Sequence, residues 1–363
     1  MTHDLTQASA AHLSRLYARG KASPVETMKA VLARTDEVNP RINCFRQVDH
    51  EASLKAARES EKRWKKGKPL SPIDGVPVSI KELVRVSGWA PTMGSKLTDK
   101  TPSEADAPAV ARLRESGAIV FAQSTSSEFG HKGVTDTPLN GITRNPWDTE
   151  RTPGGSSGGA GAAVAAGLGP LAIGTDGGGS VRIPSSFNGL VGLKATYGRV
   201  PAWPPGLNGD LANTGPMCRT ALDCALMMNA IARPDARDPT QLPPGRVMPR
   251  ALDLRGLRLG LLMDAGWGAA VEPEVAAAVT AAARAFEQAG AVVEPLAPFS
   301  TRDMADGIDR FWRMRSWLDI SALPAAQRAQ VLPYILDWVA PAAGYDVPRN
   351  DRIDVLFLLV LFC

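Results

Sequence analysis

Glycine runs flank the serines of residues 151–184, RTPGGSSGGAGAAVAAGLGPLAIGTDGGGSVRIP. Glycine weakens helices and strands, so a chain that concentrates it needs tight turns, positive φ or close backbone approach there. Backbone of this kind can also point several N–H groups at one place, which is typical of an active site. The candidate nucleophiles of this segment are Ser156 and Ser180.

A lysine upstream of this segment ends a short predicted strand. Val76, Val78 and Ile80 alternate with other residues, and this period of two is typical of a half-buried strand that runs into Lys81. Burial there would favour the neutral amine, which can act as a base. A lone lysine more often pairs with a neighbouring acid, here Glu82, and that alternative stays open.

Other serine and nucleotide chemistries fit this sequence less well. Residues 155–159 match the G-x-S-x-G elbow with Ser157 in the middle, but an α/β-hydrolase needs its histidine after the serine. All four histidines precede it, and His131 could serve only in a histidine-first order. The phosphate-binding patterns GxxxxGK[ST] and G-x-G-x-x-G after a strand are absent from the sequence. Serine chemistry with a lysine base therefore remains.

Composition indicates a globular protein, with 44% apolar and 21% charged residues. The net charge is +4 and the one dense basic run, residues 62–68, is typical of a solvated helix end, so no nucleic-acid partner is predicted. Four cysteines without CxxC spacing predict reduced thiols, a cytoplasmic location and no metal site. Val355–Cys363 is shorter than the roughly 20 residues of a membrane-spanning helix, so no membrane partner is predicted either.

Helical and strand patterns alternate along the chain, which predicts an α/β fold with a central sheet flanked by helices. Helices are expected at residues 24–38, 51–65, 108–117, 158–167 and 274–289. Strands are expected at residues 76–81, 118–123, 171–174 and 291–294. Residues 233–252 are rich in Pro, Asp and Arg and are the best candidate for a boundary. Leu257–Met263 then resumes a buried strand that could join the same sheet, so we predict a single domain over residues 1–363.

Several spaced motifs agree with one known family. Lys81, GGSSGG at 154–159 and GTDGGGSVRIP at 174–184, in this order, resemble the amidase signature family of Ser-Ser-Lys amidohydrolases. Supporting segments are GVPVSIKEL (75–83), NPWDTERTPGGSSGG (145–159), GLVGLKATYGRVP (189–201) and GPMCRTALDCALMMNAI (215–231). The resemblance is dense over a motif core at residues 72–234 and implies the amidase-signature fold, a mixed central β-sheet covered by helices on both faces.

The resemblance also implies a role for each residue of the site. It makes Ser180 the nucleophile, Ser156 the bridging serine after a cis peptide bond, and Lys81 the general base. The oxyanion hole would consist of the N–H groups of Gly177, Gly178, Gly179 and Ser180. Supporting residues, which hold the loops without transferring protons, would be Ser157, Asp176 and Arg182.

The implied reaction is hydrolysis of a small carboxylic amide to an acid plus ammonia or amine, with no metal and no cofactor. The amide is the expected partner, and a homodimer is left open. One alternative is the A subunit of a tRNA-dependent amidotransferase, although the stretch after Pro201 lacks the serine-rich sequence expected of that subunit. The other alternative is a catalytically weak, truncated fragment, because family members continue beyond this length and the end at residues 345–363 is atypical.

Overall fold

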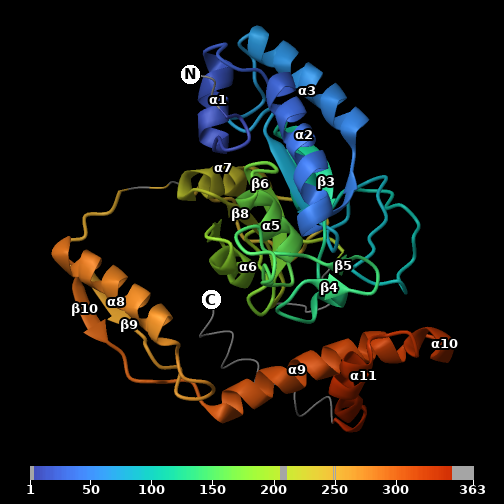
Figure 1. Cartoon of the computed structure of the whole chain (residues 1–363), viewed down its shortest axis with the longest axis vertical. Coiled ribbons are helices and arrows are strands. Elements are labelled where there is room, and N and C mark those ends of the chain that lie inside the picture. The colour runs from blue at the N-terminus through green and yellow to red at the C-terminus, as the bar shows by residue number, and fades with distance from the viewer. Residues whose placement is uncertain (1–3, 205–210, 248, 250, 346–363) are drawn as a thin grey trace. The chain divides into compact units, whose positions relative to one another are not determined.

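The computed structural model describes residues 4–204, 211–247, 249 and 251–345 (Figure 1). The atypical end predicted at residues 345–363 therefore lies outside the described residues, apart from Tyr345. The chain divides into two compact units, Met1–Pro249 and Arg250–Cys363. Their boundary falls within the connection at residues 233–252, and the single domain over the whole chain stays a prediction.

The first unit contains the helices and strands that the sequence predicts up to residue 176, with ends shifted by a few residues. Its helices are α1 (Ala10–Ala18), α2 (Pro24–Ile42), α3 (His50–Lys65), α4 (Pro108–Glu115), α5 (Gly158–Ala165), α6 (Arg182–Phe187) and α7 (Ala221–Ile231). Its strands are β1 (Phe45–Val48), β2 (Pro77–Lys81), β3 (Ile119–Ser124), β4 (Asp136–Thr137), β5 (Gly141–Ile142), β6 (Leu171–Asp176), β7 (Val191–Gly192) and β8 (Asn213–Cys218).

Six of these strands form one mixed sheet in the order β1-β3-β2-β6-β8-β7. Strand β2 pairs parallel with β3 and with β6, so it lies inside the sheet. The pairs β1–β3, β6–β8 and β7–β8 are antiparallel. This arrangement confirms the mixed central sheet, and it places the strand that carries Lys81 where water is excluded on both sides.

Helices cover both faces of this sheet. On one face Val78 and Ile80 share a core with apolar side chains of α1, α4 and α7. On the other face Phe121 of β3 packs with side chains of α2, α3 and α5. Because side chains alternate along a strand, Lys81 points away from the face of Ile80 and toward the layer that holds α5.

The second unit has its own small sheet. Strands β9 (Arg258–Leu261) and β10 (Val292–Pro295) pair in parallel and are joined through α8 (Pro273–Gln288). The prediction of a buried strand at residues 257–263 is wrong, since the residues of β9 are exposed or half-buried. Membership of the central sheet, which the sequence left open, is not observed, because β9 pairs with β10. The remaining helices are α9 (Arg302–Ser321), α10 (Ala325–Arg328) and α11 (Pro333–Val339). Trp338 of α11 donates its Nε1–H to Asp309 of α9 over 2.8 Å.

Candidate active site

Lys81, the last residue of β2, lies entirely inside the protein. Its Nζ is 2.6 Å from Ser156 Oγ and 2.9 Å from Thr175 Oγ1. Burial lowers the pKa of Lys81 to about 7, although the carboxylates of Asp176 and Glu82 act in the opposite direction. A large fraction of this lysine is therefore neutral near pH 7, as a general base requires.

Ser156 is held on a tight turn before α5. The peptide bond between Gly155 and Ser156 is cis, as the resemblance implies. A Cβ on Gly155 would lie 2.7 Å from the backbone nitrogen of Val134, so only glycine fits at this close approach. The carbonyl of Ser156 accepts the N–H of Ser127 over 3.3 Å.

Ser157 connects the turn of Ser156 to the turn of Ser180. Its N–H donates to the carbonyl oxygen of Ser180 over 3.2 Å. Its Oγ lies 3.3 Å from both the nitrogen and the carbonyl oxygen of Thr175 on β6. The structure therefore brings the loops of Lys81, Ser156 and Ser180 together, with Ser157 bridging them.

The loop between β6 and Ser180 is organised by an ion pair between the buried Asp176 and the partly exposed Arg182. Asp176 accepts hydrogen bonds from Arg182 Nε and Nη2 over 3.0 and 2.8 Å. Burial alone would raise the pKa of Asp176, but the hydrogen bonds and charge of Arg182 leave that pKa below its ordinary value. Asp176 also accepts the N–H of Gly179 over 2.7 Å and that of Val181 over 3.1 Å. These contacts fit the supporting role predicted for Asp176 and Arg182.

This loop changes the set of candidate oxyanion donors. The N–H of Gly179, one of the four predicted donors, is already engaged by Asp176. Gly179 has a φ of +119°, a conformation that side chains seldom tolerate, which explains the glycine there. The N–H groups of Gly177, Gly178 and Ser180 remain candidates, and Ser180 itself is half-buried.

The ion pair of Lys81 with Glu82 that the sequence left open is replaced by other contacts. The carboxylate of Glu82 accepts hydrogen bonds from Thr92, Ser126 and Asn140. Lys81 is thus left to the hydroxyls of Ser156 and Thr175. Burial lowers the pKa of His131 to about 4. The hydroxyl of Ser157, the serine of the G-x-S-x-G match, lies against the backbone of Thr175, which argues against a histidine-first mechanism.

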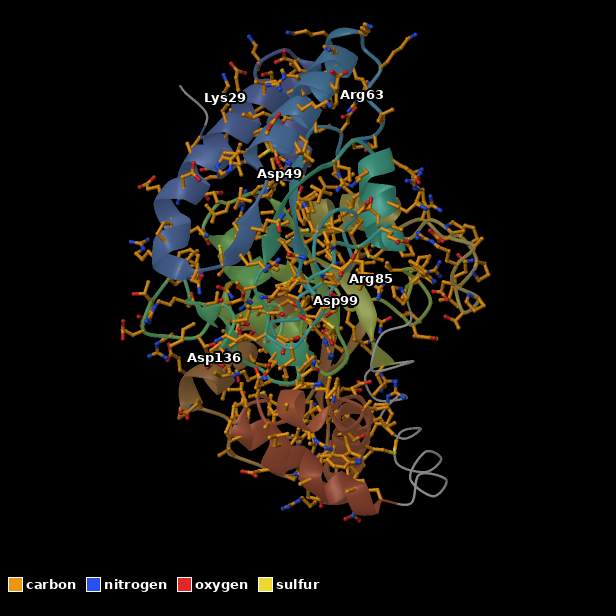
Figure 2. All side chains as sticks on the ribbon, turned by 90° about the vertical axis from the view of Figure 1, so that its right-hand side faces the viewer. Lys29, Asp49, Arg63, Arg85, Asp99 and Asp136 are labelled. Atoms are coloured by element: carbon orange, nitrogen blue, oxygen red, sulfur yellow. The ribbon has the colours of Figure 1, made fainter. Side chains whose placement is uncertain are left out.

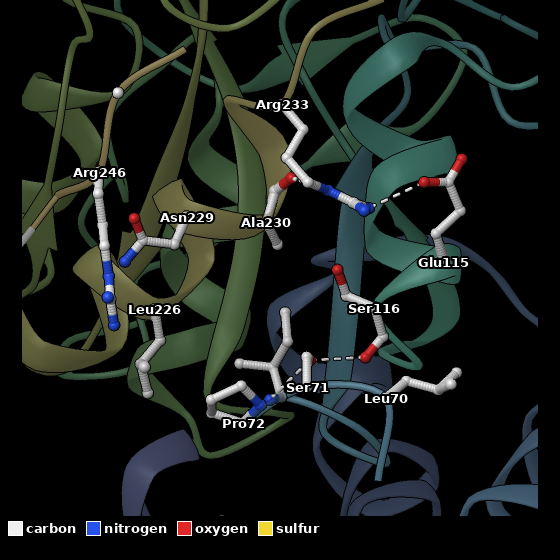
Figure 3. A pocket seen from close by; sticks show the side chains of 12 residues that line it. Leu70, Ser71, Pro72, Glu115, Ser116, Leu226, Asn229, Ala230, Arg233 and Arg246 are labelled. Atoms are coloured by element: carbon white, nitrogen blue, oxygen red, sulfur yellow. Dashed lines mark hydrogen bonds and ion pairs between the residues drawn. The ribbon is translucent and has the colours of Figure 1, made fainter.

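A hollow of about 450 Å³ opens elsewhere in the first unit, among Leu70–Ile73, the end of α4, and α7 (Figure 3). Several of its polar groups contact other groups of the protein. Arg233 pairs with Glu115 over 2.9 Å, and Asn229 exchanges hydrogen bonds with the backbone of Val247. None of the predicted site residues lines this hollow.

Charged side chains spread over the helices and loops of the first unit, from Lys29 to Asp136 (Figure 2).

Among the residues that the structure describes, no three or more His, Cys, Asp or Glu side chains gather in a way that could hold a metal ion. The described helices are all too short or too polar to cross a membrane.

Known proteins resemble this chain in sequence and in structure. The family model named Amidase matches residues 26–322. The A subunit of a glutamyl-tRNA(Gln) amidotransferase from Cupriavidus pinatubonensis (strain JMP 134) is 41% identical over 298 residues, 77% of this chain and 59% of that protein. An acylamidase from Rhodococcus erythropolis is 41% identical over 354 residues, 94% of this chain and 73% of that protein.

The solved structure of a bacterial aryl acylamidase of the amidase signature family superposes with a TM-score of 0.85 at 29% identity. That superposition covers 97% of this chain and 76% of the other. The chain spans 59–62% of the length of the amidotransferase subunits it matches first.

Proposed function

The chain belongs to the amidase family, and from this premise we propose that it hydrolyses a carboxylic amide through a Ser-Ser-Lys mechanism. The observation that carries the proposal is the contact of 2.6 Å between the buried Lys81 Nζ and Ser156 Oγ. A lysine with a pKa of about 7 can take a proton from a serine where an ordinary, charged lysine could not. The names of the relatives, which include acylamidases, support amide bonds as the substrate class.

The first half of the reaction forms an ester on Ser180. Neutral Lys81 accepts the proton of the Ser156 hydroxyl, and Ser156 in turn accepts the proton of Ser180 as its oxygen attacks the carbonyl carbon. The negative charge that develops on the carbonyl oxygen is stabilised by N–H groups of the loop, for which Gly177, Gly178 and Ser180 are the candidates. The relay then returns a proton to the departing nitrogen, so ammonia or an amine leaves.

The second half repeats these steps with water. Water gives a proton to Ser156, and Ser156 gives its own proton to Lys81, as the water oxygen attacks the acyl carbon. When the bond between that carbon and Ser180 Oγ breaks, the relay returns a proton to Ser180, and the acid is released. Every step uses groups of this chain and water. The ion pair of Asp176 with Arg182 and the hydrogen bonds of Ser157 hold the turns of Ser156 and Ser180 in place during both halves of the reaction.

A stand-alone amidase is favoured over one component of an amidotransferase. The resemblance to the acylamidase extends over 94% of this chain, whereas that to the first amidotransferase relative covers 77%. Several relatives nevertheless carry the amidotransferase name, so glutamine hydrolysis for a partner protein is the second candidate. We propose a small amide as the partner, with a homodimer left open. The buried, unbridged thiols of Cys44, Cys218 and Cys224 agree with the proposed cytoplasmic location.

Mass spectrometry after treatment with a fluorophosphonate tests which serine is acylated. The adduct is expected on Ser180, and Ser180→Ala should abolish it. Ser186→Ala, which removes an exposed hydroxyl of α6, is the matched control and should label normally. An adduct on Ser156 or Ser157 would contradict the assignment of the nucleophile.

A panel of aliphatic, aryl and amino-acid amides, assayed for released ammonia or amine, identifies the substrate class. Hydrolysis of several simple amides by the purified chain is the expected result. Activity confined to glutamine and dependent on co-expressed subunits would instead favour the amidotransferase. Release from none of them, with no adduct on Ser180, would reject the proposed function.

A further inference from the structure

We propose that Glu82 is a positioning residue, which holds two loops against Ser156 so that its hydroxyl meets Lys81. The inference deepens the proposed function and rests on it. The carboxylate of Glu82 is completely buried, and the side chain follows Lys81 directly in sequence. Burying a carboxylate is costly unless its oxygens accept several hydrogen bonds, so a fully enclosed one marks a place where its contacts matter.

Both oxygens of Glu82 are satisfied by groups from separate segments of the chain. Oε1 accepts the N–H and the Oγ–H of Ser126 over 2.8 and 3.0 Å, and Nδ2–H of Asn140 over 2.8 Å. Oε2 accepts the hydroxyl of Thr92 and lies 3.9 Å from Nε of Arg46. One side chain thus joins four segments that are far apart in sequence.

One of these segments lies directly against the bridging serine. The residue after Ser126 is Ser127, whose N–H donates to the carbonyl of Ser156 over 3.3 Å. A Cβ built on Gly130 would lie 3.5 Å from Ser156 Oγ. The backbone of residues 126–130 therefore forms a wall beside the Ser156 hydroxyl, and Glu82 holds the start of that wall.

The second segment, around Thr92, packs against residues 126–130. The carbonyl of Met93 accepts the N–H of Phe129 over 2.8 Å. Met93 and Phe129 both have a φ of +51°, which residues with side chains adopt only where surrounding contacts enforce it. A Cβ on Gly94 would lie 2.9 Å from the carbonyl oxygen of Ser127, so the two loops are in close backbone contact. Glu82 binds both loops and fixes them relative to each other.

Glu82→Gln tests this role, because it keeps the shape of the side chain but replaces one acceptor with a donor. The matched control is Asp74→Asn, since Asp74 is also fully buried and pairs with Arg63 over 2.6 Å, but contacts none of the site loops. We expect kcat of Glu82→Gln to fall by about 10- to 100-fold, the range for a small misplacement of reacting groups. KM should change by less than about threefold, because Glu82 is fully buried and the substitution alters no exposed group. Asp74→Asn should keep kcat within about twofold at temperatures where it is folded.

Thr92→Val is the second variant, and it keeps the proposal testable if Glu82→Gln does not fold. It removes one hydroxyl from the carboxylate with little change in volume, and a smaller fall in kcat in the same direction is expected. Equal losses of kcat in Glu82→Gln and Asp74→Asn would overturn the proposal, because both would then reflect general destabilisation. Full activity in both Glu82→Gln and Thr92→Val would also overturn it.

Crystal structures of the variants give a readout that does not depend on activity. The contact between Ser127 N and Ser156 O should open in Glu82→Gln and persist in Asp74→Asn. A wild-type chain without amidase activity that still shows this difference would reject the proposed function and leave the positioning role supported. An unchanged contact in Glu82→Gln would reject the positioning role alone.

Discussion

The buried amine of Lys81 determines the pH range in which the proposed site can act. Burial lowers its pKa to about 7, so the neutral form grows as pH rises through that value. We expect kcat/KM to rise with pH and to level off above about pH 8, with activity at pH 6 about one tenth of the plateau. Lys81→Ala should lower kcat at least about a hundredfold and remove this rise. An unchanged pH profile in the variant would mean that another group titrates.

The lowered pKa of Lys81 also predicts how the free energy of unfolding changes with pH. Between about pH 7 and the ordinary lysine value near 10.4, the unfolded chain binds a proton that the folded chain does not. The free energy of unfolding should therefore increase with pH over this window. Lys81→Met should be more stable than the wild type near pH 6, and the difference should shrink toward pH 10. Denaturant titrations at several pH values measure it, and a constant difference would contradict a depressed pKa.

Thr175 is a residue of the site that sequence reasoning did not single out. When Lys81 is neutral, an N–H of Nζ can donate to Thr175 Oγ1 over 2.9 Å, which directs the lone pair toward Ser156. Loss of one such hydrogen bond is worth about 1 kcal/mol, so Thr175→Val should lower kcat by roughly fivefold to tenfold with little change in KM. Thr175→Ser, which keeps the hydroxyl, should restore most of the rate. If the valine and serine variants behave alike, the hydroxyl has no role.

The residues of the site differ in how far the sequence reveals them. Lys81, Ser156 and Ser180 lie in spaced motifs, and the family resemblance that these motifs carry implied the relay in which Lys81 contacts Ser156. The role of Ser180 stays a prediction. The partners of Glu82 come from residues 46, 92, 126 and 140, and no periodicity or spacing along the chain links these positions. Strand alternation does not identify Thr175, since it puts this residue on the face of Ile173 and Ile80, away from Lys81. The contact forms at the ends of β2 and β6 and is visible only in the structure.

At the scale of elements, α5 shows why the segment at residues 151–184 is so rich in glycine. A Cβ on Gly159 would lie 2.4 Å from Thr125 Oγ1 and 2.5 Å from the carbonyl oxygen of Cys44. Gly159→Ala gains about 1 kcal/mol in helix propensity. Placing a Cβ against this closely packed backbone costs about 1–3 kcal/mol or more, so we expect Gly159→Ala to have a lower free energy of unfolding than the wild type.

Denaturant unfolding of Gly159→Ala measures this loss. Gly133→Ala is the matched control, because its Cβ would meet Ile183 Cδ1 at an ordinary distance of 3.9 Å. The control should unfold like the wild type. A Gly159→Ala variant as stable as the control would show that α5 can move away from β3.

Three of the six strands in the central sheet could be predicted, because these buried strands carry continuous or alternating apolar residues. Strands β2, β3 and β6 begin and end within two residues of the predicted ranges. The same reasoning failed at residues 257–263, where leucines also predict a buried strand. There Arg258 and Gly260 interrupt the run and both are exposed, so β9 forms only a short parallel pair with β10.

At the scale of the whole molecule, the clusters of buried apolar side chains that the structure describes belong to the first unit, although the second unit also buries apolar residues such as Met314, Ile335 and Val339. The three clusters of buried apolar side chains, with the residues packed on them, include nothing beyond Val247. In the second unit α8 buries none of its residues. A unit with its own core can fold without its neighbour, so we expect the first unit to resist conditions that open the connection after it.

Limited trypsin digestion tests this expectation. Arg246 and Arg255 are exposed in or just after the connection at residues 233–252, so early cleavage there should leave a resistant fragment from the N-terminus. The fragment should still carry a fluorophosphonate adduct on Ser180, since every predicted site residue precedes the cut. The exposed basic residues of α3 are an internal control, because helical hydrogen bonds should protect that backbone. Digestion without a resistant fragment, together with one cooperative unfolding transition for the intact chain, would favour the single domain that the sequence predicts.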